Sequence, residues 1–102
     1  MNRYIAFCKI MELNSFTKAA EALGYTQSGI SQMIKSLEEE FGFPLLVRSR
    51  AGVRLTPEGK ILLPFFQKTV YDNRELLEKS REIKGLHSGE VRIGTFSSVS
   101  TH

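Results

Sequence analysis

A set of short polar side chains lies on one side of a predicted helix in the middle of the chain. Its members are Gln27, Ser28, Ser31, Gln32 and Lys35. The opposite side carries an apolar stripe at spacings of three and four, formed by Ile30, Ile34, Leu37 and Phe41. A solvated helix face usually carries Glu and Lys, whereas amides and hydroxyls match the donors and acceptors on DNA base edges. We therefore predict a base-reading face, with an ordinary polar surface as the alternative.

Three arginines lie in the following segment, residues 46–55, which is predicted to form a β-hairpin. Its strands are 46–48 and 53–55, and the turn between them contains a glycine. Arg48, Arg50 and Arg54 can reach phosphates or a minor groove if the hairpin lies beside the helix. Each arginine alone is better explained as an exposed charge, but three of them on one hairpin favour nucleic-acid binding.

Residue types that support catalysis or metal binding are sparse. His87 and His102 lie in a predicted connection and at the terminus, and no cysteine or carboxylate is spaced with them as a metal site. The serines near the C-terminus lack a base in a fixed position; they are Ser97, Ser98 and Ser100. We therefore predict no catalytic residue and no metal ligand, and we expect that the protein is not an enzyme.

Composition sets the scale of the molecule. The 102 residues suffice for one domain with an appendage, and 41% of them are hydrophobic, which permits a small core. The net charge is only +3, so any phosphate-binding surface is local. The single cysteine, Cys8, excludes an internal disulfide and is predicted to be a buried structural thiol. Because the longest apolar run, 61–66, is too short to span a bilayer and no secretory signal is visible, we expect a soluble, cytoplasmic protein with no membrane partner.

Three short helices are predicted to position the base-reading face. The first spans 3–12, and the second spans 16–23 between a serine cap and a glycine stop. The third spans 26–41, with Thr26 as its cap. Two helices joined by a tight glycine corner, the second with a free polar face, are typical of a helix-turn-helix, and the basic hairpin would be its wing. The predicted fold is therefore a mainly α winged helix-turn-helix.

A long helix is predicted to follow the wing. Thr56-Pro57-Glu58 is a strong helix start, and the helical pattern continues to about Lys84, on the order of 40 Å. Its apolar side chains form an interrupted stripe: Leu62, Phe66, Val70, Leu76, Leu77 and Ile83. Because three short helices are too small to cover this stripe, we predict that it packs against the same helix of a second copy. Pro64 should kink this helix; two helices with a break at Leu63 are the alternative.

The C-terminal residues are predicted to begin another domain. Residues 85–89 should form a flexible connection, and 90–96 alternates as a strand. Since a lone terminal strand has no partner here, the chain is interpreted as a fragment of a longer protein. The predicted organisation is a DNA-binding domain at 1–56, a dimerisation helix at 57–85, and a hinge with the first strand of a truncated domain at 86–102.

Over nearly all of its length, the chain resembles the N-terminal part of the bacterial LysR-type transcriptional regulators. The resemblance rests on the segments SFTKAAEALGYTQSGISQMIKSLEEEFG and LLVRSRAGVRLTPEGKILL, which match the family's helix-turn-helix, wing and linker-helix start. It extends through EVRIGTFSSVS, which is similar to the first strand and following loop of the family's effector-binding domain. It implies a winged helix that binds double-stranded DNA as a homodimer, or as a tetramer in the full-length protein, and reads an inverted repeat.

The resemblance also implies which side chains face the DNA. From the recognition helix they would be Thr26, Gln27, Ser28, Ser31, Gln32 and Lys35. Arg48, Arg50 and Arg54 would serve the wing, and Thr17 or Lys18 would touch backbone phosphate. The family often has Pro where this chain has Ser28 and Arg where it has Gln32. Gln32 favours adenine where an arginine would favour guanine, so the base preference of relatives does not transfer.

No cofactor is implied for this fragment, whereas a small-molecule effector is implied for the full-length protein. In the family, a periplasmic-binding-protein-like domain senses a metabolite and adjusts the bend of promoter DNA. The loop at 95–100 would contribute to that site in the parent protein only.

Three alternatives differ in what they predict. The first is a winged helix of another regulator family, or one that recognises RNA; the long C-terminal helix and the trailing strand favour the LysR type, and the base-reading face favours duplex DNA. A dimerisation module with the helix-turn-helix as scaffold predicts that Gln32 and Arg50 are dispensable and that no salt-sensitive nucleic-acid binding occurs. An enzyme is the weakest alternative, because no candidate nucleophile has a base.

Overall fold

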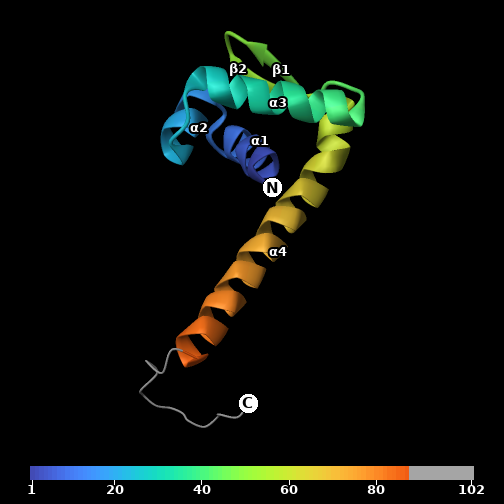
Figure 1. Cartoon of the computed structure of the whole chain (residues 1–102). Helices are drawn as coiled ribbons and strands as arrows, with labels where there is room; N and C mark the ends of the chain where they lie inside the picture. Colours follow the sequence, from blue (N-terminus) through green and yellow to red (C-terminus); the bar gives the residue numbers. More distant parts are fainter. Residues whose placement is uncertain (88–102) are drawn as a thin grey trace. The chain divides into compact units, whose positions relative to one another are not determined.

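The computed structural model describes residues 1–87, which form five short elements and one long helix (Figure 1). In chain order these are α1 (Asn2–Leu13), α2 (Phe16–Leu23), α3 (Gln27–Phe41), β1 (Leu46–Ser49), β2 (Gly52–Leu55) and α4 (Pro57–His87). The strands pair as an antiparallel hairpin. The predicted mainly α fold with a hairpin wing is therefore confirmed. The chain divides into two compact units, Met1–Val70 and a second that begins at Tyr71.

Side-chain caps begin the helices where the sequence predicts them. Ser15 accepts a hydrogen bond from the Lys18 amide at 3.0 Å, and Thr26 accepts one from the Gly29 amide at 2.9 Å. Each cap satisfies an amide that has no partner inside its helix. Gly24 ends α2 with φ 79°, a left-handed conformation that suits glycine. These local signals fix the corner between α2 and α3.

The first three helices enclose a small apolar core. Its fully buried large side chains are Phe7, Ile10, Ile30, Leu37 and Leu45. Phe66 of α4 joins this core at 5% exposure, with its ring centroid 5.0 Å from that of Tyr4, 5.1 Å from that of Phe7 and 5.6 Å from that of Phe41. Aromatic rings at such distances attract beyond their buried area. The core also holds the first turns of α4 against α1 and α3.

The prediction that Phe66 faces a second copy is therefore wrong. The apolar residues of α4 do not form one stripe, because the first turns of the helix supply both core residues and exposed ones. Phe66 is enclosed, Leu62 is half-buried against the core, and Phe65 is 64% exposed. A periodic pattern marks apolar positions but does not say which neighbour covers them.

The junction between α3, the wing and α4 is closed by hydrogen bonds. The Glu38 carboxylate accepts from the amides of Leu45 and Leu46 at 2.7 and 3.2 Å. Thr56 donates its hydroxyl to the Pro44 carbonyl at 2.8 Å and accepts from the Gly59 amide at 3.0 Å, so it caps α4 as predicted. A Cβ at Gly59 would overlap the Leu45 carbonyl oxygen, so only glycine permits this approach.

Helix α4 is a single helix that contains Pro64 and continues through His87. The alternative of two helices with a break at Leu63 is wrong, since a proline removes one backbone donor without ending the helix here. The predicted connection at 85–89 is also wrong in its first part, because 85–87 are helical. A single glycine near a helix end weakens the helix but does not force it to stop. The predicted strand at 90–96 and the loop at 95–100 lie outside the described residues.

Candidate nucleic-acid interface

Helix α3 presents the predicted base-reading side chains to solvent. Its buried side is Ile30, Ile34 and Leu37, and the opposite side is open. The exposed members of the predicted set are Gln27, Ser28, Gln32 and Lys35, while Ser31 is half-buried. No carboxylate lies between residues 27 and 37, so nothing acidic on this stretch would repel a phosphate backbone.

Two glutamates at the C-terminal end of α3 interact with other parts of the protein. Arg3 of α1 pairs with the Glu40 carboxylate and donates to the Ser36 hydroxyl at 3.1 Å. The Glu38 carboxylate accepts hydrogen bonds from the two backbone amides at the start of the wing. The negative charge of the 38–40 segment is therefore partly compensated at the end of α3 that lies away from the reading residues.

The wing is a short hairpin whose tip is Arg50 and Ala51. Its register pairs Ser49 with Gly52, Arg48 with Val53, and Val47 with Arg54. Because side chains alternate across a strand, Arg48 and Arg54 lie on opposite faces of the hairpin. The three predicted wing arginines thus occupy three different places: two faces and the tip.

Arg48 is held beside the recognition helix. Its guanidinium carbon lies 4.0 Å from the centroid of the Phe16 ring, and its Nη1 donates to the Ser31 hydroxyl at 3.4 Å. A guanidinium over an aromatic face is attracted by the ring's negative quadrupole. All three arginines are exposed, but within residues 1–87 neither Arg50 nor Arg54 has a comparable ring or hydroxyl contact. Arg48 is therefore oriented by the protein in a way that the other two are not.

Thr17 and Lys18 are exposed in the first turn of α2, next to the wing. A shallow depression of about 160 Å³ lies between the two elements; residues that line it include Thr17, Arg48 and Ser49. The structure thus brings Thr17 close to Arg48, while Thr26 remains at the start of α3 as its cap. All of the predicted backbone-contact residues are exposed on the first compact unit.

Sequence reasoning missed Asn14, which anchors the wing. Asn14 has φ 55° and ψ 38°, and its side-chain oxygen accepts from the Val53 amide at 2.9 Å. Asparagine adopts this left-handed conformation more readily than most residues, which is the only local signal for its role. Gly52, at φ 124°, packs against the same side chain: a Cβ there would lie 2.8 Å from the Asn14 amide nitrogen.

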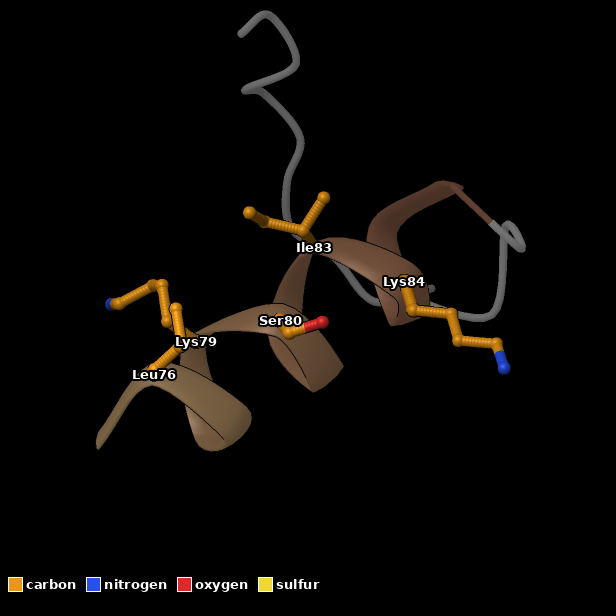
Figure 2. A pocket seen from close by; sticks show the side chains of 5 residues that line it. All are labelled: Leu76, Lys79, Ser80, Ile83 and Lys84. Carbon is orange, nitrogen blue, oxygen red and sulfur yellow. The ribbon is translucent and has the colours of Figure 1, made fainter. Parts of the chain in front are cut away.

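Helix α4 carries most of the exposed apolar side chains. Of the predicted dimerisation residues, Leu76, Leu77 and Ile83 are exposed, and Leu62 and Val70 are half-buried. Ile61 and Phe65, which the predicted stripe did not include, are also exposed. Figure 2 shows a shallow groove in the second unit, lined by Leu76, Lys79, Ser80, Ile83 and Lys84.

Other chemistry is limited in the described part of the chain. Cys8 is half-buried against the core, and burial raises the pKa of its thiol. Residues 1–87 contain no cluster of three His, Cys, Asp or Glu side chains that could hold a metal ion. None of the helices in this range has the length and apolar character to cross a membrane.

The sequence of the chain is similar to those of known bacterial regulators. Residues 1–60 match the family model described as bacterial regulatory helix-turn-helix protein, lysR family. The chain belongs to the LysR family. It is 40% identical over 101 residues to the HTH-type transcriptional regulator BudR of Klebsiella aerogenes, covering 98% of this chain and 71% of BudR. It is 37% identical over 97 residues to the uncharacterized HTH-type transcriptional regulator YvbU of Bacillus subtilis, covering 94% of this chain and 33% of YvbU.

Solved structures of LysR proteins share the fold. One is the crystal structure of the BenM DNA-binding domain in complex with catB site 1 DNA, with a TM-score of 0.75 and 32% identity over 81% of this chain and 93% of that one. Another is oxidized Corynebacterium glutamicum OxyR, with a TM-score of 0.77 and 32% identity over 82% of this chain and 26% of that one. The chain spans about a third of the length of the first curated relatives it matches.

Proposed function

We propose that this chain binds duplex DNA as the DNA-binding part of a LysR-type transcriptional regulator. The observation that carries the proposal is the open polar face of α3, free of carboxylates from 27 to 37 and flanked by the basic wing. The width of a DNA major groove admits an α-helix presented in this way. The likeness to the BenM domain, which was crystallised with DNA, supports DNA binding by this fold.

In this docking the exposed side chains divide into two groups. Gln27, Ser28, Gln32 and Lys35 would reach base edges, together with Ser31. Thr17, Lys18, Arg50 and Arg54 would contact phosphates or an adjacent minor groove. Base contacts set sequence preference, whereas phosphate contacts set register and salt dependence.

The second element of the proposal is a homodimer formed through α4. Exposed Leu76, Leu77 and Ile83 support it, because a soluble helix rarely leaves several large apolar side chains uncovered. Within the first unit, Ile61 and Phe65 of α4 are also exposed, whereas Phe66 is enclosed. Two heads related by a two-fold axis would read an inverted repeat. In the full-length protein we further propose a tetramer and a small-molecule effector.

The experiment is selection of duplexes from a random pool by the purified chain at low and moderate salt. We expect an enriched inverted repeat with a central spacer. Gln32→Ala should relax preference at one base position by about 1–3 kcal/mol. Arg50→Ala should instead weaken binding to all sequences and lower the salt slope by about one.

Two outcomes would contradict the proposal. Retention of DNA without an enriched sequence would leave only non-specific phosphate binding. No retention at all would favour the alternative in which the helix-turn-helix is a scaffold for dimerisation.

A further inference from the structure

Arg48 joins three elements of the proposed interface at one point. It belongs to β1, its guanidinium lies over the ring of Phe16 at the start of α2, and it donates to the hydroxyl of Ser31 on α3. The ring contact is 4.0 Å from the centroid, and the hydrogen bond, at 3.4 Å, is long. Since Phe16 is 5% exposed and part of the core, the ring is a rigid support for the guanidinium.

This contact favours the Ser31 hydroxyl as a hydrogen-bond donor. A hydroxyl has one hydrogen to donate and two lone pairs that accept. Arg48 can only donate, so it occupies one lone pair of Ser31 and leaves the hydrogen and the second lone pair available. The adjacent positive charge strengthens the hydroxyl as a donor and weakens it as an acceptor. Thr69 in α4 behaves differently, because its hydroxyl donates to the Phe65 carbonyl one turn earlier at 2.8 Å. No such carbonyl contact occupies the Ser31 hydroxyl in the described part of the chain.

We propose that Arg48 is a specificity-determining positioning residue, which holds Ser31 as a hydrogen-bond donor toward DNA and fixes the wing to the recognition helix. The inference rests on the proposed DNA binding and refines it. A serine that donates more readily than it accepts favours acceptors on a base edge, such as guanine N7 and O6 or thymine O4, over the amino groups of adenine and cytosine.

The competing role for Arg48 is a simple phosphate contact, and lysine separates the two roles. Lysine keeps the positive charge but lacks the planar group that stacks on an aromatic ring, and its ammonium rotates freely. A phosphate contact therefore tolerates Arg48→Lys, whereas the positioning role does not. Arg50 is the matched control, since it is an arginine of the same hairpin that has no contact with an aromatic ring of residues 1–87.

The test is a double-mutant cycle on the selected operator. Binding of the parent chain, Arg48→Ala, Ser31→Ala and the double variant is measured against duplexes altered at each base pair in turn. We expect both single variants to relax preference at the same base pair, about five- to tenfold, and the double variant to relax it no further. Arg48→Lys should restore the salt dependence but not the preference, while Arg50→Ala and Arg50→Lys should leave the preference unchanged.

Additive effects at different base pairs would overturn the inference, as would restoration of preference by Arg48→Lys. A measurement on the free protein separates this inference from the proposed function. Stacking on Phe16 should shift the side-chain proton resonances of Arg48 upfield, and those of Arg50 should stay at ordinary positions. If the Arg48 resonances are unshifted, the inference fails even when DNA is bound specifically. If they are shifted but the parent chain enriches no sequence, the proposed function fails first, and with it the role of Arg48 in specificity.

Discussion

In the first compact unit, Met1–Val70, the chain covers most of its own large apolar side chains, whereas in the second unit, from Tyr71, it leaves them exposed. Ile30, Ile34 and Leu37 of α3 are all enclosed by α1, α2 and the start of the wing. Leu76, Leu77 and Ile83 of α4 are all about half or more exposed. Both segments have amphipathic helical patterns, so the pattern alone does not distinguish them.

The contrast indicates which surface needs a partner. Seven of the ten exposed large hydrophobic residues in the described chain belong to α4. The exposed surface of α3 is polar and suits a hydrated, charged partner, whereas that of α4 is apolar and suits another apolar face. The first unit is expected to fold by itself, and the second to become stable through association.

Two adjacent phenylalanines of α4 should differ most in their contribution to the free energy of unfolding. Phe66→Ala should lower the free energy of unfolding by about 3–5 kcal/mol, because it removes a ring packed on three other rings and leaves a cavity. Phe65→Ala is the matched control, since Phe65 is 64% exposed and its loss should change stability by less than about 0.5 kcal/mol. Urea unfolding at low protein concentration measures both. Equal losses would contradict the division between the two faces of α4.

A charge on the apolar surface of α4 tests whether this surface packs against a second copy of the chain. Leu76→Asp should weaken the proposed dimer by at least about 2 kcal/mol, or about thirtyfold, because two buried leucines per dimer are replaced by carboxylates. The fold of the first unit should be unchanged by circular dichroism. Sedimentation equilibrium measures the association, and binding to a full inverted repeat should weaken while binding to a half-site does not.

Arg81→Ala is the control for this variant, since it changes the net charge of α4 by the same amount at an exposed polar position. It should leave the association almost unchanged. A dimer that tolerates Leu76→Asp would mean that this part of α4 is not at the interface.

Much of the first unit is predictable from sequence because its signals are local. Ser15, Thr26 and Thr56 cap helices, and Gly24 and Gly42 end them, where residue type alone indicates it. The open polar face of α3 follows from the spacing of its buried residues, so the exposure of Gln32 was predictable as well.

What could not be predicted depends on contacts between distant residues. The periodicity places Phe66 on the wrong surface, because its burial is decided by rings of α1 and α3 and not by its neighbours in α4. The support of Arg48 by Phe16 joins residues far apart in sequence, as does the bond from Val53 to Asn14. Helical periodicity contains no information about such pairs.

Substitutions of Asn14 test whether this residue anchors the wing to the first unit, and we expect their effect to be small. Asn14→Ala removes the acceptor for the Val53 amide and places alanine in a left-handed conformation, which together should cost about 1–2 kcal/mol of stability. Asn14→Gly separates these causes, because glycine suits φ 55° but also lacks the acceptor. Hydrogen exchange of the Val53 amide should accelerate in both variants, whereas the stability loss should be smaller with glycine. If exchange is unchanged in both, Asn14 does not anchor the wing, and the contacts of Arg48 and Glu38 hold it instead.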